Sequence, residues 1–130
     1  FIVGGQIKDQ PMELYLIYPQ GNYIKPADSK PYLVIGEVKY GKPILDRVIK
    51  PDVSIGDASR CALISIDSTL KSDLTVGPPI DFVVYKKNEY KILSQKCLNI
   101  ADDEYSKVCN QWSDGIFKIF NSFPRFDWEK

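Results

Sequence analysis

The stretch Lys39-Tyr40-Gly41-Lys42-Pro43-Ile44-Leu45-Asp46-Arg47 marks the point where this sequence changes from extended chain to helix. Upstream of it, the apolar run 32–35 ends at Gly36. A proline such as Pro43 is compatible with a helix only in the first turn, and Pro51 ends the helix that follows. The apolar residues recur at helical intervals: Tyr40, Ile44, Leu45 and Val48. We therefore expect a short helix here, preceded by strands.

A second helix is predicted directly downstream. Ser54 and Asp57 have the spacing of a capping box, in which the hydroxyl and the carboxylate each bond the other residue's backbone amide. The helix body carries a stripe of small residues beside a stripe of bulkier ones: Ala58, Cys61, Ala62 and Ser65, then Leu63, Ile66 and Leu70. Small residues let a helix pack closely on a sheet or on another helix.

Upstream, the pattern is strand, strand, turn, strand in antiparallel order. The segment 1–5 reads as a strand entered partway through a larger protein, or as the start of a processed chain. In Met12–Tyr18 both faces of the predicted strand are largely apolar, which implies cover on both sides. A turn at 19–22 leads to the short strand Tyr23–Ile24.

Downstream, Asp73–Pro79 is a loop because Gly77 is followed by two prolines. A hairpin is predicted from a strand at Ile80–Tyr85, a turn at 86–88 and a return strand at Glu89–Leu93. The last helix starts near Asp102 and Asp103, which favour the positive end of its dipole. Pro124 ends it and leaves a tail, 125–130. Its apolar stripe, expected to be core or interface, is Tyr105, Val108, Cys109, Trp112, Ile116, Ile119 and Phe123.

Composition excludes several classes of function. The chain carries 17 basic and 17 acidic residues and no histidine, so we expect neither a nucleic-acid nor a membrane partner. Without histidine, Ser-His-Asp and Cys-His activation are excluded, and no metal or other cofactor is expected. Cys61, Cys97 and Cys109 form no CxxC pair and predict reduced thiols of a cytoplasmic protein, with Cys61 and Cys109 packing rather than reacting.

The element order and several strings resemble the proteasome and its bacterial relatives, in particular the family called Anbu, or ancestral β-subunit. The Lys39–Arg47 string is the most specific, and together the strings cover nearly the whole chain. The others are Gly4-Gly5-Gln6, Tyr18-Pro19-Gln20-Gly21-Asn22, Ile35-Gly36-Glu37, Cys61-Ala62-Leu63-Ile64-Ser65 with Asp67-Ser68-Thr69, Val76-Gly77-Pro78 with Ile80-Asp81, Gln111-Trp112-Ser113 and Asp127-Trp128.

The resemblance implies an α+β fold, the four-layer αββα sandwich of the N-terminal-nucleophile hydrolases, with residues 1–130 as the C-terminal portion of one proteasome-like domain. In such threonine-type peptidases the first residue of the mature chain attacks a peptide carbonyl, and its own α-amino group is the base. An α-amine titrates near about 8, so a modest downward shift lets it accept a proton at neutral pH. The implied partners are a peptide or protein substrate and further copies in a ring or open-spiral homo-oligomer.

The chain departs from this pattern at Phe1, which offers no hydroxyl or thiol, so no nucleophile is expected within it. By resemblance, Glu37 falls where proteasome β-subunits carry the serine of Gly-Ser beside the threonine, and Asp73 begins the Asp-x-x-Ser-Gly position. Both are candidate supporting residues, since a carboxylate raises the pKa of a nearby ammonium and orients it. Val76 stands where a hydroxyl is usual.

Other interpretations stay open. Glu37 equally fits a solvated charge at a helix start, and Asp73 a turn residue beside Thr75. Lys39 and Lys42 fit surface charges, and Asp46 and Arg47 fit local or intersubunit ion pairs. A non-catalytic scaffold or assembly subunit is the alternative function, and a degradation product is the third. The N-terminal residue of the mature protein discriminates the first two.

Overall fold

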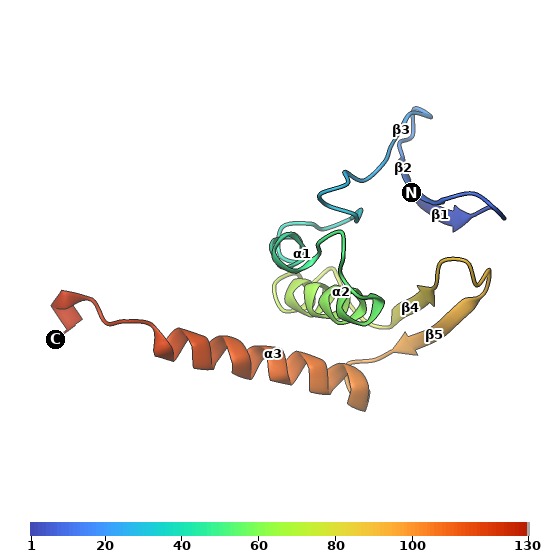
Figure 1. Cartoon of the computed structure of the whole chain (residues 1–130). Helices are drawn as coiled ribbons and strands as arrows, with labels where there is room; N and C mark the ends of the chain where they lie inside the picture. Colours follow the sequence, from blue (N-terminus) through green and yellow to red (C-terminus); the bar gives the residue numbers. More distant parts are fainter. Residues whose placement is uncertain (130) are drawn as a thin grey trace.

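A computed structural model describes residues 1–129; Lys130, the last residue of the expected tail 125–130, lies outside them. The fold is α+β, as expected: the described residues form two small antiparallel sheets and three α-helices, and Figure 1 shows how these lie. None of the described helices is long and apolar enough to cross a membrane. The elements are β1 Ile2–Gln6, β2 Met12–Ile17, β3 Tyr23–Ile24, α1 Lys42–Val48, α2 Ile55–Leu70, β4 Ile80–Tyr85, β5 Ile92–Leu98, α3 Asp103–Ser122 and a final 3-10 turn Asp127–Glu129.

The first sheet has the predicted order. β1 pairs antiparallel with β2, and β2 with β3. The turn between β2 and β3 contains Gly21 at φ +86°, a conformation that favours glycine. The expected cover on both faces of this sheet is absent from residues 1–129: β2 is only half-buried, while Tyr23 and Ile24 of β3 are 61% and 44% exposed.

The second sheet is the hairpin β4–β5, and here the predicted return strand was wrong. The strand runs over Ile92–Leu98, not over Glu89–Leu93. Asn88 and Tyr90 both have positive φ, at 67° and 51°, so the connection uses more residues than a tight turn. As a result Tyr85 pairs with Ile92, and Ile80 at the other end pairs with Leu98.

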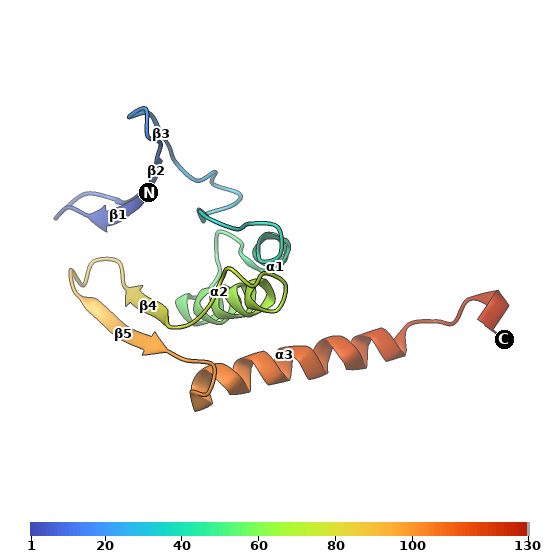
Figure 2. The same cartoon turned by 180° about the vertical axis from the view of Figure 1, so that it is seen from behind.

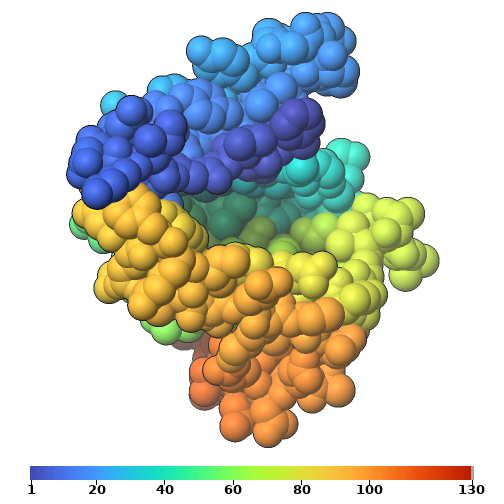
Figure 3. All heavy atoms as spheres, turned by 90° about the vertical axis from the view of Figure 1, so that its right-hand side faces the viewer, coloured from blue at the N-terminus to red at the C-terminus, as the bar shows by residue number. Residues whose placement is uncertain are grey.

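The two hairpins lie side by side, as the contact between the blue and gold segments in Figure 3 shows. The side-chain amide of Gln6 donates to the Asn88 side-chain oxygen at 2.8 Å, and the Asn88 backbone N–H donates back to Gln6 Oε1 at 2.8 Å. The Tyr90 hydroxyl also accepts a 3.4 Å bond from the Asp9 backbone. Polar contacts at the hairpin tips therefore join sheets that are distant in sequence.

The starts of α1 and α2 follow the sequence signals. Pro43 lies in the first turn of α1, and the Ile49 backbone N–H closes its end on the Leu45 carbonyl at 2.8 Å. At α2, Ser54 Oγ accepts the Asp57 backbone N–H at 3.0 Å, as a capping box requires. The reciprocal half differs from expectation, because the Asp57 carboxylate accepts the Ser54 hydroxyl at 2.6 Å instead of a backbone amide.

The two predicted stripes of α2 serve two separate cores. The small-residue stripe packs on α1, where Leu45, Ile49 and Cys61 are buried with Ala58 against them. The run 32–35 has no regular secondary structure and adds Tyr32 and Val34 to this core. The bulky stripe packs against β4, β5 and α3 in the second core, which consists of Ile80, Leu98, Tyr105 and Cys109 with Leu63, Ile66, Leu70 and Phe82.

Only the first half of the α3 stripe is core. Tyr105 and Cys109 are buried, whereas Ile116, Ile119 and Phe123 are about half exposed or more. Figure 2 shows why: α3 runs under α2 and then continues past it, so the C-terminal end stands away from the other elements. In the tail, the Phe126 and Trp128 rings stack on each other at 5.8 Å rather than on the core.

Candidate functional site

The first candidate residue, Glu37, sits in the connection that enters α1. Gly36, directly before it, has φ +81°, which turns the chain out of the extended run 32–35. The half-buried Glu37 carboxylate then accepts the Lys39 backbone N–H at 2.7 Å. This local bond fixes the carboxylate at the start of a tight turn, which ends in the buried Gly41.

The second candidate, Asp73, lies just beyond the end of α2. Its carboxylate accepts the Thr75 backbone N–H at 2.8 Å and the Thr75 hydroxyl at 2.7 Å. These two bonds, the hydroxyl first, lower the pKa of Asp73 below its ordinary value, and the Lys39 charge lowers it further. Asp73 is therefore an ionised, oriented carboxylate at neutral pH.

The last turn of α2 brings the two loops together. Gly41 packs so closely on α2 that a Cβ there would lie 2.3 Å from Ser65 Oγ and 3.1 Å from Thr69 Oγ1. The Asp73 backbone N–H donates to the Thr69 carbonyl at 2.8 Å. Both loops therefore rest on the same turn near the end of α2, and the Lys39 charge acts on Asp73.

Sequence reasoning passed over Thr75 and Gly41 as parts of this site. The spacing Asp-x-Thr does carry a signal for Thr75, because aspartate commonly accepts the amide two residues onward. Gly41 carries no such signal, since its backbone is in the ordinary right-handed region at φ −87° and only the packing requires glycine.

Chemically, this site offers two carboxylates and one lysine. Carboxylates of this kind can orient a cationic group such as an ammonium and raise its pKa. Among residues 1–129 no group of three histidine, cysteine, aspartate or glutamate side chains converges on a common point.

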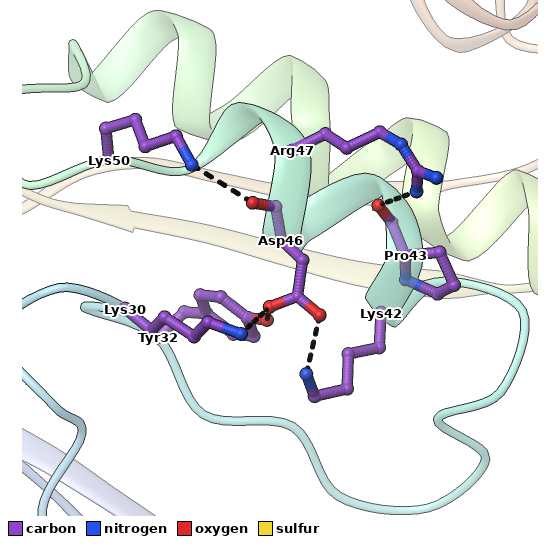
Figure 4. A network of polar contacts seen from close by, with 7 residues as sticks. All are labelled: Lys30, Tyr32, Lys42, Pro43, Asp46, Arg47 and Lys50. Carbon is purple, nitrogen blue, oxygen red and sulfur yellow. Dashed lines mark hydrogen bonds and ion pairs between the residues drawn. The ribbon is translucent and has the colours of Figure 1, made fainter.

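A separate polar cluster lies on α1 and is shown in Figure 4. Asp46 forms ion pairs with Lys30 and Lys42, both at 2.7 Å, and accepts the Tyr32 hydroxyl at 2.7 Å. The ion pair expected of Asp46 is thus local. Arg47 instead donates to the Pro43 carbonyl at 2.6 Å.

Neither Glu37 nor Asp73 lines the two hollows described next. A hollow of about 780 Å³ lies between the two hairpins. The residues that line it include Met12, Leu14, Tyr85 and Tyr90. Another, of about 580 Å³, lies between the run 31–35 and α2. Both have mainly apolar walls.

Known structures resemble this fold over nearly its whole length. Anbu from Hyphomicrobium sp. superposes with a TM-score of 0.92 at 44% identity, over 97% of this chain and 54% of that one. Anbu from Yersinia bercovieri gives 0.93 at 40%, over 97% and 53%. The helical assembly of the Anbu complex from Pseudomonas aeruginosa gives 0.90 at 42%, over 96% and 52%.

Sequence comparison points the same way. No family model matches the chain. Proteasome subunit beta 2 of Pyrobaculum calidifontis is 36% identical over 87 residues, which are 67% of this chain and 41% of that protein. The chain thus spans about half the length of the relatives that it matches. From these matches, the chain is a homologue of Anbu and of the proteasome β-subunits.

Proposed function

We propose that this chain is the C-terminal portion of a proteasome-type, threonine-type peptidase of the N-terminal-nucleophile class. The observation that carries the proposal is the meeting of the Glu37 and Asp73 loops on the last turn of α2. Two carboxylates on loops that rest on the same turn of α2 are suited to orient the α-ammonium of a nucleophilic N-terminal residue. The nucleophile itself would come from residues outside 1–130.

The proposed complete domain is a four-layer αββα sandwich. The exposed apolar side chains of the first sheet and the hollow of about 780 Å³ between the hairpins support this arrangement, since both offer surface for further strands and helices. The length of the relatives, about twice that of this chain, supports it as well.

The proposed partners are a peptide or protein substrate and further copies of the same protein in a ring or open spiral, in the cytoplasm. The Pseudomonas aeruginosa relative, described as a helical assembly of the Anbu complex, supports the spiral form. The exposed second half of α3 offers apolar surface that an assembly could cover.

A non-catalytic assembly subunit is the alternative, and Val76 favours it. By resemblance this position carries a hydroxyl in proteasome β-subunits, and Val76 supplies none. In this alternative the Asp73–Thr75 pair would serve only to shape the loop after α2.

One experiment separates the two functions. The N-terminal residue of the mature gene product is determined by mass spectrometry, and fluorogenic peptides are then assayed with the wild type, Glu37→Ala and Asp73→Asn. The peptidase predicts a threonine, serine or cysteine at the N-terminus and turnover that falls at least about tenfold in both variants. An N-terminus without such a residue, together with no turnover, supports the assembly subunit.

A further inference from the structure

The close contact between Gly41 and α2 brings the turn before α1 onto the same part of α2 that holds the loop after this helix. Gly41 ends the turn that carries Glu37 and Lys39, and it is buried. A Cβ at this position would lie 2.3 Å from Ser65 Oγ, 2.8 Å from the Ser65 carbonyl oxygen and 3.1 Å from Thr69 Oγ1. Real Cβ atoms do not approach other atoms so closely, so any side chain here must displace the turn from the helix.

The same helical turn fixes the second loop. The Thr69 carbonyl accepts the backbone N–H groups of Ser72 and Asp73 at 3.0 and 2.8 Å. The orientation of the Thr69 hydroxyl is itself fixed, because it donates to the Ser65 carbonyl at 3.0 Å. Ser65 and Thr69 are both buried, at 8% and 7% exposure, so this part of α2 is a rigid platform shared by both loops.

We propose that Gly41 is a positioning residue of the site, and that its contact with Ser65 and Thr69 sets the place of the Glu37 loop relative to Asp73. This inference rests on the proposed function for its catalytic meaning, while the structural part stands without it. Gly41 touches no reacting group; it acts through Glu37 and Lys39. Small misplacements of positioned groups carry large rate penalties, about a hundredfold for 1 Å.

Alanine at position 41 tests the contact without changing the backbone preference. Gly41 has φ −87° and ψ −37°, which alanine adopts readily. Gly56 in the first turn of α2 is the matched control, because its Cβ would lie 3.8 Å from Arg60 Nη1 and 3.9 Å from Ser54 Oγ, ordinary contact distances. Gly41→Ala combined with Ser65→Ala removes the nearest clashing atom and should restore part of the wild-type behaviour.

The experiment uses the complete gene product and two independent readouts. The first is the titration of Asp73 by NMR: Gly41→Ala should change the Asp73 pKa, because the turn that carries Lys39 shifts, and Lys39→Met should raise it with the contact intact. The second is peptide turnover, where Gly41→Ala should lower kcat at least about tenfold and leave KM nearly unchanged. Gly56→Ala should match the wild type in both.

The outcomes separate this inference from the proposed function. If the wild-type protein turns over no peptide, the peptidase proposal fails and the Asp73 titration alone decides the inference. If Gly41→Ala titrates and turns over like Gly56→Ala, Gly41 has no positioning role. Thermal unfolding identifies any variant that does not fold; in that case the double variant with Ser65→Ala is compared with Ser65→Ala alone, and identical titration of the two overturns the proposal.

Discussion

The carboxylate of Asp73 accepts two hydrogen bonds from Thr75, one from its backbone N–H at 2.8 Å and one from its hydroxyl at 2.7 Å. These two bonds close the loop that leaves α2. The loop begins at Ser72 and Asp73, whose backbone N–H groups both donate to the Thr69 carbonyl. One threonine thus both orients the candidate carboxylate and stabilises its ionised form.

Replacing Thr75 by valine should raise the pKa of Asp73 toward its ordinary value, because the hydroxyl bond is the largest cause of the lowered pKa. The backbone bond remains, so a part of the shift should persist. A depressed carboxyl pKa stabilises the fold above the pKa of the unfolded chain, and this stabilisation is lost as pH falls through the folded value. NMR titration measures the shift, with Thr75→Ser as the control that keeps the hydroxyl; an unchanged pKa in Thr75→Val would contradict the prediction.

Asp46→Asn should make residues 30–35, which pack against α1, more flexible. The amide keeps an acceptor for the Tyr32 hydroxyl but loses both ion pairs, so Lys30 and Lys42 are left without their partner charge. Hydrogen exchange should rise in residues 30–35 and the Tm should fall. Glu104→Gln, which breaks an exposed ion pair with Lys96, is the control and should change little.

Acid provides a second check on Asp46. Hydrogen bonds from the ammonium groups of Lys30 and Lys42 and from the Tyr32 hydroxyl, in this order, hold the pKa of Asp46 well below its usual range. The stabilisation from this lowered pKa is therefore complete above the ordinary aspartate value of about 3.9 and disappears only in stronger acid. Below that value the Tm of the wild type should approach that of Asp46→Asn; a constant difference would contradict this assignment.

Local signals predicted the helices well. Pro43 and Pro51 bracket α1, Ser54 begins α2, and the two stripes of α2 correspond to two cores. The register of the second hairpin was missed, because its connection depends on positive φ at Asn88 and Tyr90, and the latter residue type gives no warning of it. The stripe of α3 was predicted to be core or interface, and only its first half is core among the described residues, since an apolar stripe does not reveal whether its partner lies within the same chain.

The candidate site was only partly accessible to sequence reasoning. Resemblance selected Glu37 and Asp73, but the placement of their loops on one turn of α2 depends on the packing of Gly41 on Ser65, a tertiary contact between residues 24 positions apart in sequence. A buried glycine with ordinary backbone angles has no signal in the neighbouring sequence that predicts its packing role. The two loops could be predicted from the sequence. The part of α2 on which both of them rest could be identified only from the fold.

Cys61 and Cys109 should resist alkylation in the folded protein. They are 2% and 5% exposed, and burial raises the pKa of both thiols, so little thiolate forms at neutral pH. Cys97 is exposed and is removed as Cys97→Ser to give a clean background. Mass spectrometry after iodoacetamide should find no modification in the native state and two modifications in denaturant; native labelling at the unfolded rate would contradict the buried positions.

Tyr105→Phe should leave stability unchanged or increase it by about 1 kcal/mol, because the Tyr105 hydroxyl is buried and has no hydrogen-bond partner among the described residues. Tyr105→Ala should instead cost about 3–5 kcal/mol, since the ring fills the core between α2, α3 and the second sheet. Denaturant unfolding measures both. Burial, the largest cause, also raises the pKa of Tyr105 strongly, so ultraviolet titration should find one tyrosine that ionises only on unfolding in alkali. A large loss of stability in Tyr105→Phe would mean that the hydroxyl bonds a group supplied from outside residues 1–129, and the isolated core described for this chain would then be incomplete at that point.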